Sequence, residues 1–159
     1  MTLTTTEILI RLGTALLCGA IIGINRDLRR KPAGFRTFGI VGMASALVVM
    51  VMDQTPYGGA DAVSRVIQGV LTGIGFLGAG MILHKEQPAK IAGLTTAAAV
   101  WLTAALGMAA GAGQLKLTWI ALGLGLLLLL LGGPTERMLE RLLKRPRVKP
   151  RTPHDQTPQ

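Results

Sequence analysis

The amino-acid sequence predicts an all-α, polytopic membrane protein with five transmembrane helices. Five long apolar segments fill the chain up to Pro134, short polar joints separate them, and none shows a polar face at helical spacing. About 20 apolar residues span the roughly 30 Å hydrocarbon core of a bilayer. A soluble bundle would carry polar faces along its helices. We therefore expect an integral membrane protein in which residues 1–133 form one transmembrane domain.

The five predicted spans are of similar length. At about 1.5 Å rise per residue, each reaches about 25–29 Å. Slight thinning of the bilayer or anchoring at its interfaces covers the remaining distance. The spans are Ile8–Ile24, Phe35–Met52, Val66–Leu83, Ala92–Ala110 and Leu115–Leu131.

Glycines spaced four residues apart mark the first and third spans. The first span carries Gly19 and Gly23, and the third carries Gly69, Gly73, Gly75, Gly78 and Gly80. This spacing lets two helix backbones approach closely, within one chain or across a dimer. So many glycines also weaken an isolated helix, by up to about 1 kcal/mol each. A second interpretation of the third span is therefore a discontinuous helix that lines an ion or substrate path.

The last two spans and the tail carry their own signals. The fourth span begins with Gly93, Thr95 and Thr96. The hydroxyl groups of the two threonines can donate hydrogen bonds to backbone carbonyls of the same helix. The leucine-rich fifth span is expected to face lipid and to end at Gly132, Gly133 and Pro134. Residues 134–145 have apolar and charged faces, which predicts a short amphipathic helix on the inner membrane surface. The basic, proline-rich residues 146–159 are expected to be disordered.

Basic residues gather on one side of the predicted domain. Of the 17 Lys and Arg residues, five lie in the first joint, two in the third and seven after Pro134. The positive-inside rule then predicts an external N-terminus and a cytoplasmic C-terminus. The net charge of +9 therefore favours lipid headgroups over nucleic acid as the partner. Cys18 is the single cysteine, and no metalloprotease, nucleotide-binding or nucleophile motif occurs, so neither an enzyme nor a cofactor or metal site is expected.

The densest polar group lies in the first joint, within residues 23–37. Pro32 is expected to end the first helix at Lys31, and Gly34 to provide the turn before the second. Asp27 is the only carboxylate among the basic residues, which are Arg26, Arg29, Arg30, Lys31 and Arg36. Two interpretations remain open: an ion pair that holds the hairpin closed, and a functional carboxylate–arginine site.

Three blocks of sequence resemble the MgtC/SapB family of bacterial inner-membrane proteins. The first is Gly23–Thr37, with its Lys-Pro-Ala-Gly-Phe-Arg-Thr sequence. The second is Ser64–Leu83, which contains the dense glycines, and the third begins at Gly93. Asn25 stands where many members have an acidic residue.

The resemblance implies a five-helix domain linked to magnesium limitation, acid stress and, in pathogens, virulence. Family members are described as regulators or inhibitors, including of the proton-driven ATP synthase. The C-terminal cytoplasmic domain of many members is expected to be absent here. The residues that the resemblance marks as functional are Arg26, Asp27, Lys31, Pro32, Gly34, Arg36, Thr37, Arg65, Gln68, Gly73, Gly75, Gly78 and Gly80.

Two functions follow as hypotheses. The first is a non-enzymatic, multi-pass regulator of the bacterial inner membrane. It would contact another membrane complex, such as the ATP synthase, and form a homo-oligomer, most simply a dimer. Its glycine faces would mediate association, and Arg26, Asp27 and Arg36 would form a cytoplasmic contact. The alternative is an oligomeric transporter or channel for Mg²⁺, H⁺ or a small solute, with a path formed by the glycines of the third span and Asp27.

Overall fold

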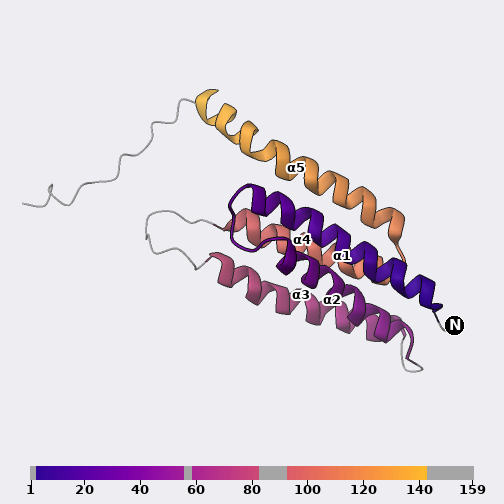
Figure 1. Cartoon of the computed structure of the whole chain (residues 1–159). Helices are drawn as coiled ribbons and strands as arrows, with labels where there is room; N and C mark the ends of the chain where they lie inside the picture. Colours follow the sequence, from indigo (N-terminus) through magenta and orange to yellow (C-terminus); the bar gives the residue numbers. More distant parts are fainter. Residues whose placement is uncertain (1–2, 56–58, 83–92, 143–159) are drawn as a thin grey trace, which may run out of the picture. The chain divides into compact units, whose positions relative to one another are not determined.

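The computed structural model describes residues 3–55, 59–82 and 93–142. Within these ranges the chain is all-α, and its five helices are long and apolar enough to cross a membrane (Figure 1). This confirms the predicted fold class, whereas the orientation across the membrane stays a prediction. The helices are α1 (Thr5–Leu28), α2 (Phe35–Asp53), α3 (Ala60–Ile82), α4 (Leu94–Gly111) and α5 (Leu115–Leu142).

The chain divides into two compact units, residues 1–126 and residues 127–159. In the first unit, α1, α2 and α4 pack against one another, and α3 packs against α4 and α2. The described part of the second unit, residues 127–142, is the C-terminal portion of α5. The buried hydrophobic residues of the described chain lie in the first unit, and they combine small side chains such as Ala15 and Ala46 with larger ones such as Ile22 and Phe38.

Glycines bring the backbones of α1, α2 and α4 into contact. A Cβ atom at Gly19 would strike the carbonyl oxygen of Phe38, and one at Gly23 would strike the backbone of Phe35. On α4, a Cβ at Gly107 would strike the carbonyl oxygen of Gly42. Gly19 and Gly23 therefore lie where α1 meets the start of α2. The helices approach so closely because no side chain separates them.

The glycines of α3 behave differently. A Cβ atom at Gly69, Gly73, Gly75 or Gly80 would meet no atom within 4 Å, and only Gly78 faces a neighbour, the Cβ of Ala97 at 3.6 Å. Because α3 runs unbroken from Ala60 to Ile82, the discontinuous-helix interpretation was wrong. Contact across an oligomer stays a prediction for the open positions.

Arg11 joins the start of the chain to the turn between α4 and α5. Its Nη1 donates a hydrogen bond of 2.9 Å to the carbonyl oxygen of Gly111, at the end of α4. Gly113 takes the left-handed conformation (φ 78°) that lets the chain leave the helix beside this guanidinium. A cation at a helix C-terminus also interacts favourably with the helix dipole.

The fifth helix is longer than expected. It continues through Gly132, Gly133 and Pro134 to Leu142, whereas its candidate membrane-spanning part, Leu115–Gly133, ends where the fifth span was expected to end. The Thr135 hydroxyl donates to the carbonyl oxygens of Leu131 and Gly132, at 2.8 Å and 2.9 Å, within this turn. The expected surface helix of residues 134–145 is therefore not a separate element as far as Leu142. Residues 143–145 and the predicted disordered tail, 146–159, lie outside the described residues.

Candidate functional site

The joint between α1 and α2 has a defined backbone conformation. The amide of Lys31 bonds the carbonyl oxygen of Arg26 at 3.0 Å, and that of Arg30 bonds the carbonyl oxygen of Asp27 at 2.9 Å. This pair of backbone hydrogen bonds is the usual C-terminal cap of a helix that ends at one left-handed residue, here Arg30 (φ 50°). Ala33 is also left-handed (φ 62°). A non-glycine residue in this region costs about 1–2 kcal/mol, so neighbouring contacts must hold the joint in shape.

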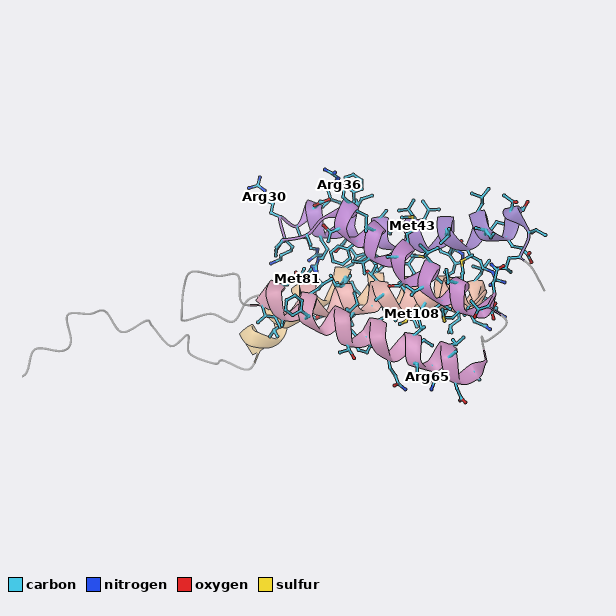
Figure 2. The ribbon with its side chains drawn as sticks, turned by 90° about the horizontal axis from the view of Figure 1, so that it is seen from below. Arg30, Arg36, Met43, Arg65, Met81 and Met108 are labelled. Atoms are coloured by element: carbon cyan, nitrogen blue, oxygen red, sulfur yellow. The ribbon has the colours of Figure 1, made fainter. Side chains whose placement is uncertain are left out.

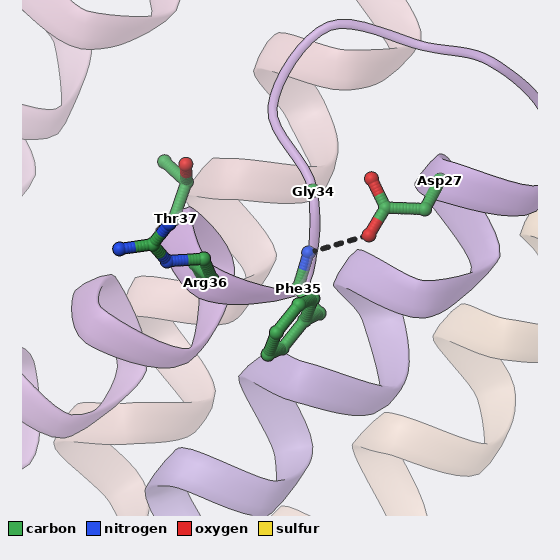
Figure 3. Close-up of a pocket in the computed structure, with 5 residues that line it drawn as sticks. All are labelled: Asp27, Gly34, Phe35, Arg36 and Thr37. Carbon is green, nitrogen blue, oxygen red and sulfur yellow. Dashed lines mark hydrogen bonds between the residues drawn. The ribbon is translucent and has the colours of Figure 1, made fainter.

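Asp27 supplies one such contact. Its Oδ2 accepts a hydrogen bond of 2.9 Å from the backbone amide of Phe35, the first residue of α2 (Figure 3). The residue before it, Gly34, gives α2 no side-chain cap, so the carboxylate of α1 caps α2 instead. A Cβ at Gly34 would overlap this carboxylate. A side chain at position 34 would therefore have to displace the carboxylate and, with it, the cap on α2.

An open hollow of about 260 Å³ lies beside this cap, lined by Asp27, Gly34, Phe35, Arg36 and Thr37 (Figure 3). The structure thereby brings together four residues of the predicted polar cluster and adds Phe35. The side chains of Arg36 and Arg30 extend outward at the same end of the molecule (Figure 2). Lys31 and Pro32 are exposed in the joint but do not line the hollow.

Arg26 lies apart from this cluster. Its side chain is 2% exposed, and its Nε and Nη1 atoms are buried without a hydrogen-bond partner. Because α1 stays helical to Leu28, Arg26 falls on the same buried face as Ile22 and Gly23. Asp27, one residue on, is exposed, and its carboxylate accepts the hydrogen bond from the Phe35 amide at the start of α2. The predicted ion pair of Asp27 with Arg26 and Arg36 is therefore not formed.

The other predicted residues lie on α3 and α4. Arg65 and Gln68 are exposed on α3, as are all of its glycines except Gly78. Gly93 precedes α4 in a left-handed conformation (φ 102°), and a Cβ there would strike the carbonyl oxygen of Met81. Thr95 is exposed, whereas Thr96 is buried. None of these residues lines the hollow, so α3 and the α1–α2 hairpin are separate candidate surfaces.

Sequence reasoning missed two residues that matter structurally. Phe35 matters through its backbone amide, and the signal for it was the glycine before it, which cannot cap a helix with a side chain. The other is Gly111, whose carbonyl oxygen receives Arg11 from 100 residues away in the chain. A local sequence pattern cannot predict a contact between residues that lie so far apart in the chain.

The fold and the capped hairpin define a multi-pass, all-α membrane protein with a polar hollow at one end of its bundle. A sequence model of the MgtC family matches residues 12–138. The chain therefore belongs to the MgtC family, as the resemblance of its motifs indicated.

Individual relatives agree with this assignment. SrpB of Synechococcus elongatus is 48% identical over 117 residues, which cover 67% of this chain and 64% of SrpB. "Putative magnesium transporter YhiD" of Escherichia coli K12 is 46% identical over 123 residues, 71% of this chain and 54% of that protein. Protein MgtC of Salmonella typhimurium LT2 is 37% identical over 109 residues, 68% of this chain and 45% of MgtC. The chain thus spans about half to two thirds of these relatives, and no solved structure matches it.

Proposed function

We propose that this protein is a non-enzymatic regulator that contacts another membrane complex through its α1–α2 hairpin. The observation that carries the proposal is the surface around the hollow. Arg30, Arg36 and Phe35 are exposed there, and Leu28 is 80% exposed. Apolar residues beside cations form a surface on which a protein partner with acidic and apolar groups could dock.

The hairpin suits this role because its shape is fixed before any partner arrives. The bond from Phe35 to Asp27 and the backbone bonds at Arg30 and Lys31 hold the joint in a conformation that is strained at two residues. A preorganised loop loses less entropy on binding than a flexible one. By the positive-inside rule, this end faces the cytoplasm. Family resemblance suggests adaptation to low magnesium or acid stress as the setting and the ATP synthase as one candidate partner.

A charge reversal tests the contact. Arg36→Glu is expected to abolish rescue of a deletion strain in low-magnesium medium, because it repels an acidic partner while disturbing no described hydrogen bond. Protein level in the membrane should stay normal. Lys116→Glu, an equal charge change at an exposed position at the start of α5, is the matched control and should still rescue growth. Equal rescue by both variants would exclude the hairpin as the contact.

The alternative function is transport, which the name of YhiD raises for that relative. Purified protein in liposomes that contain a magnesium- or pH-sensitive dye distinguishes the two functions. A regulator is expected to give no flux above that of protein-free liposomes. Flux that scales with protein content and is lost in Gly73→Leu would instead support a path along α3.

A further inference from the structure

The outward face of α3 combines polar residues with glycines. Two rows of residues, each spaced by four, run side by side along it, and all of their members are exposed. Such rows are the ridges that interdigitate when two helices pack. The rows are Asp61, Arg65, Gly69 and Gly73, and Ser64, Gln68, Thr72, Phe76 and Gly80.

The glycine row leaves a furrow that nothing in the described chain fills. A Cβ at Gly69 or Gly73 meets no atom within 4 Å, although glycines at the same spacing on α1 touch the backbone of α2. Phe76, beside the furrow, is 82% exposed. Arg65 points away from the rest of the bundle (Figure 2). A furrow of this form admits the backbone of a second helix at close range.

Polar groups on this face argue against lipid as its covering. The side-chain Nε2 of Gln68 donates only to the Ser64 hydroxyl, at 3.4 Å. The side-chain Oε1 of Gln68 accepts no hydrogen bond within the described residues. Thr72 donates to the backbone carbonyl oxygen of Gln68 at 2.8 Å. Lipid tails offer no hydrogen-bond partner to the remaining amide groups, whereas another polar helix does.

We propose that α3 pairs with α3 of a second copy of this chain, in a two-fold homodimer that crosses at Gly69 and Gly73. Copies of one membrane protein share an orientation, so the two helices run parallel about an axis normal to the membrane. The Gln68 amides, each both donor and acceptor, can then bond each other across the axis. The two Gln68 side chains therefore satisfy each other without a polar group from any other residue.

Charge complementarity favours a second copy over another partner. Asp61 and Arg65 lie one turn apart on the same row, and neither forms an ion pair within the described residues. In a two-fold dimer, Asp61 of each chain faces Arg65 of the other, which gives two reciprocal pairs. The long side chain of arginine spans helices that diverge from the crossing point. This inference is independent of the proposed hairpin contact, because it uses a different helix.

Disulfide crosslinking in native membranes tests the proposal directly. In a Cys18→Ala background, Thr72→Cys is expected to give a disulfide-linked product of twice the chain mass on oxidation. Gly123→Cys, at an equally open position on α5, is the matched control and should stay monomeric. Equal crosslinking at both positions, or a product of another mass from Thr72→Cys, would overturn the inference.

Substitutions in the furrow supply a second measurement. Gly73→Leu should raise the dimer dissociation constant in lipid by about tenfold or more, because the added side chain separates the helices. Its thermal stability in dilute detergent should match that of Gly123→Leu, since a Cβ at either position meets no atom of the described residues within 4 Å. Asp61→Arg alone should weaken the dimer, and the double variant Asp61→Arg/Arg65→Asp should restore it. A dimer that tolerates Gly73→Leu, or no restoration by the double variant, would contradict this interface.

Discussion

Gly107→Leu is expected to destabilise the protein by about 3 kcal/mol or more, the largest effect we predict for a single substitution. Gly107 lies where α4 meets α2, and a Cβ there would overlap the carbonyl oxygen of Gly42. The obstacle is backbone, which cannot rotate away as a flexible side chain does. Helices α2 and α4 would have to separate, with loss of their shared packing.

The measurement is thermal unfolding in detergent, together with the amount of folded protein in membranes. Gly123→Leu is the matched control, because a Cβ at that glycine of α5 meets no atom within 4 Å. It should unfold at or above the wild-type temperature, since leucine favours helix more than glycine does. If both variants unfold alike, the backbone contact between α2 and α4 does not stabilise the fold.

Asp27→Ala is expected to destabilise the hairpin by about 1–2 kcal/mol, the usual cost of removing a helix cap. The carboxylate satisfies the amide of Phe35, and the preceding glycine offers no substitute. Two residues of the joint are left-handed, so loss of this bond also releases backbone strain. Hydrogen exchange at the Phe35 amide, or proteolysis of the joint, should report the opening.

Asp27→Asn separates capping from ion pairing. Asparagine caps helices about as well as aspartate, so this variant should retain most of the stability that Asp27→Ala loses. An ion pair with Arg36 would instead make the two variants equally harmful. The charge swap Asp27→Arg/Arg36→Asp should fail to restore stability, because arginine has no acceptor for the Phe35 amide. Restoration by the swap would bring back the ion-pair interpretation.

The number and the position of the helices follow from the sequence. Each apolar segment must match the hydrocarbon thickness, a condition that a single segment meets by itself. The close-packing role of Gly19 and Gly23 was also predictable, since their spacing places both on one helix face. The C-terminal end of α5 could not be predicted. Glycine and proline disfavour a helix without always ending it, and here the helix continues through Gly132, Gly133 and Pro134 to Leu142.

The tertiary structure decided what each polar and glycine side chain touches. The helical phase turns Arg26 into the interior and the adjacent Asp27 toward α2, so two residues of one motif have different roles. Gly69 has the same four-residue spacing to the next glycine as Gly19, yet a Cβ there would meet no atom of the described residues within 4 Å. Spacing defines a face within one helix, whereas contact depends on which helix lies opposite, and that depends on the packing of the whole chain.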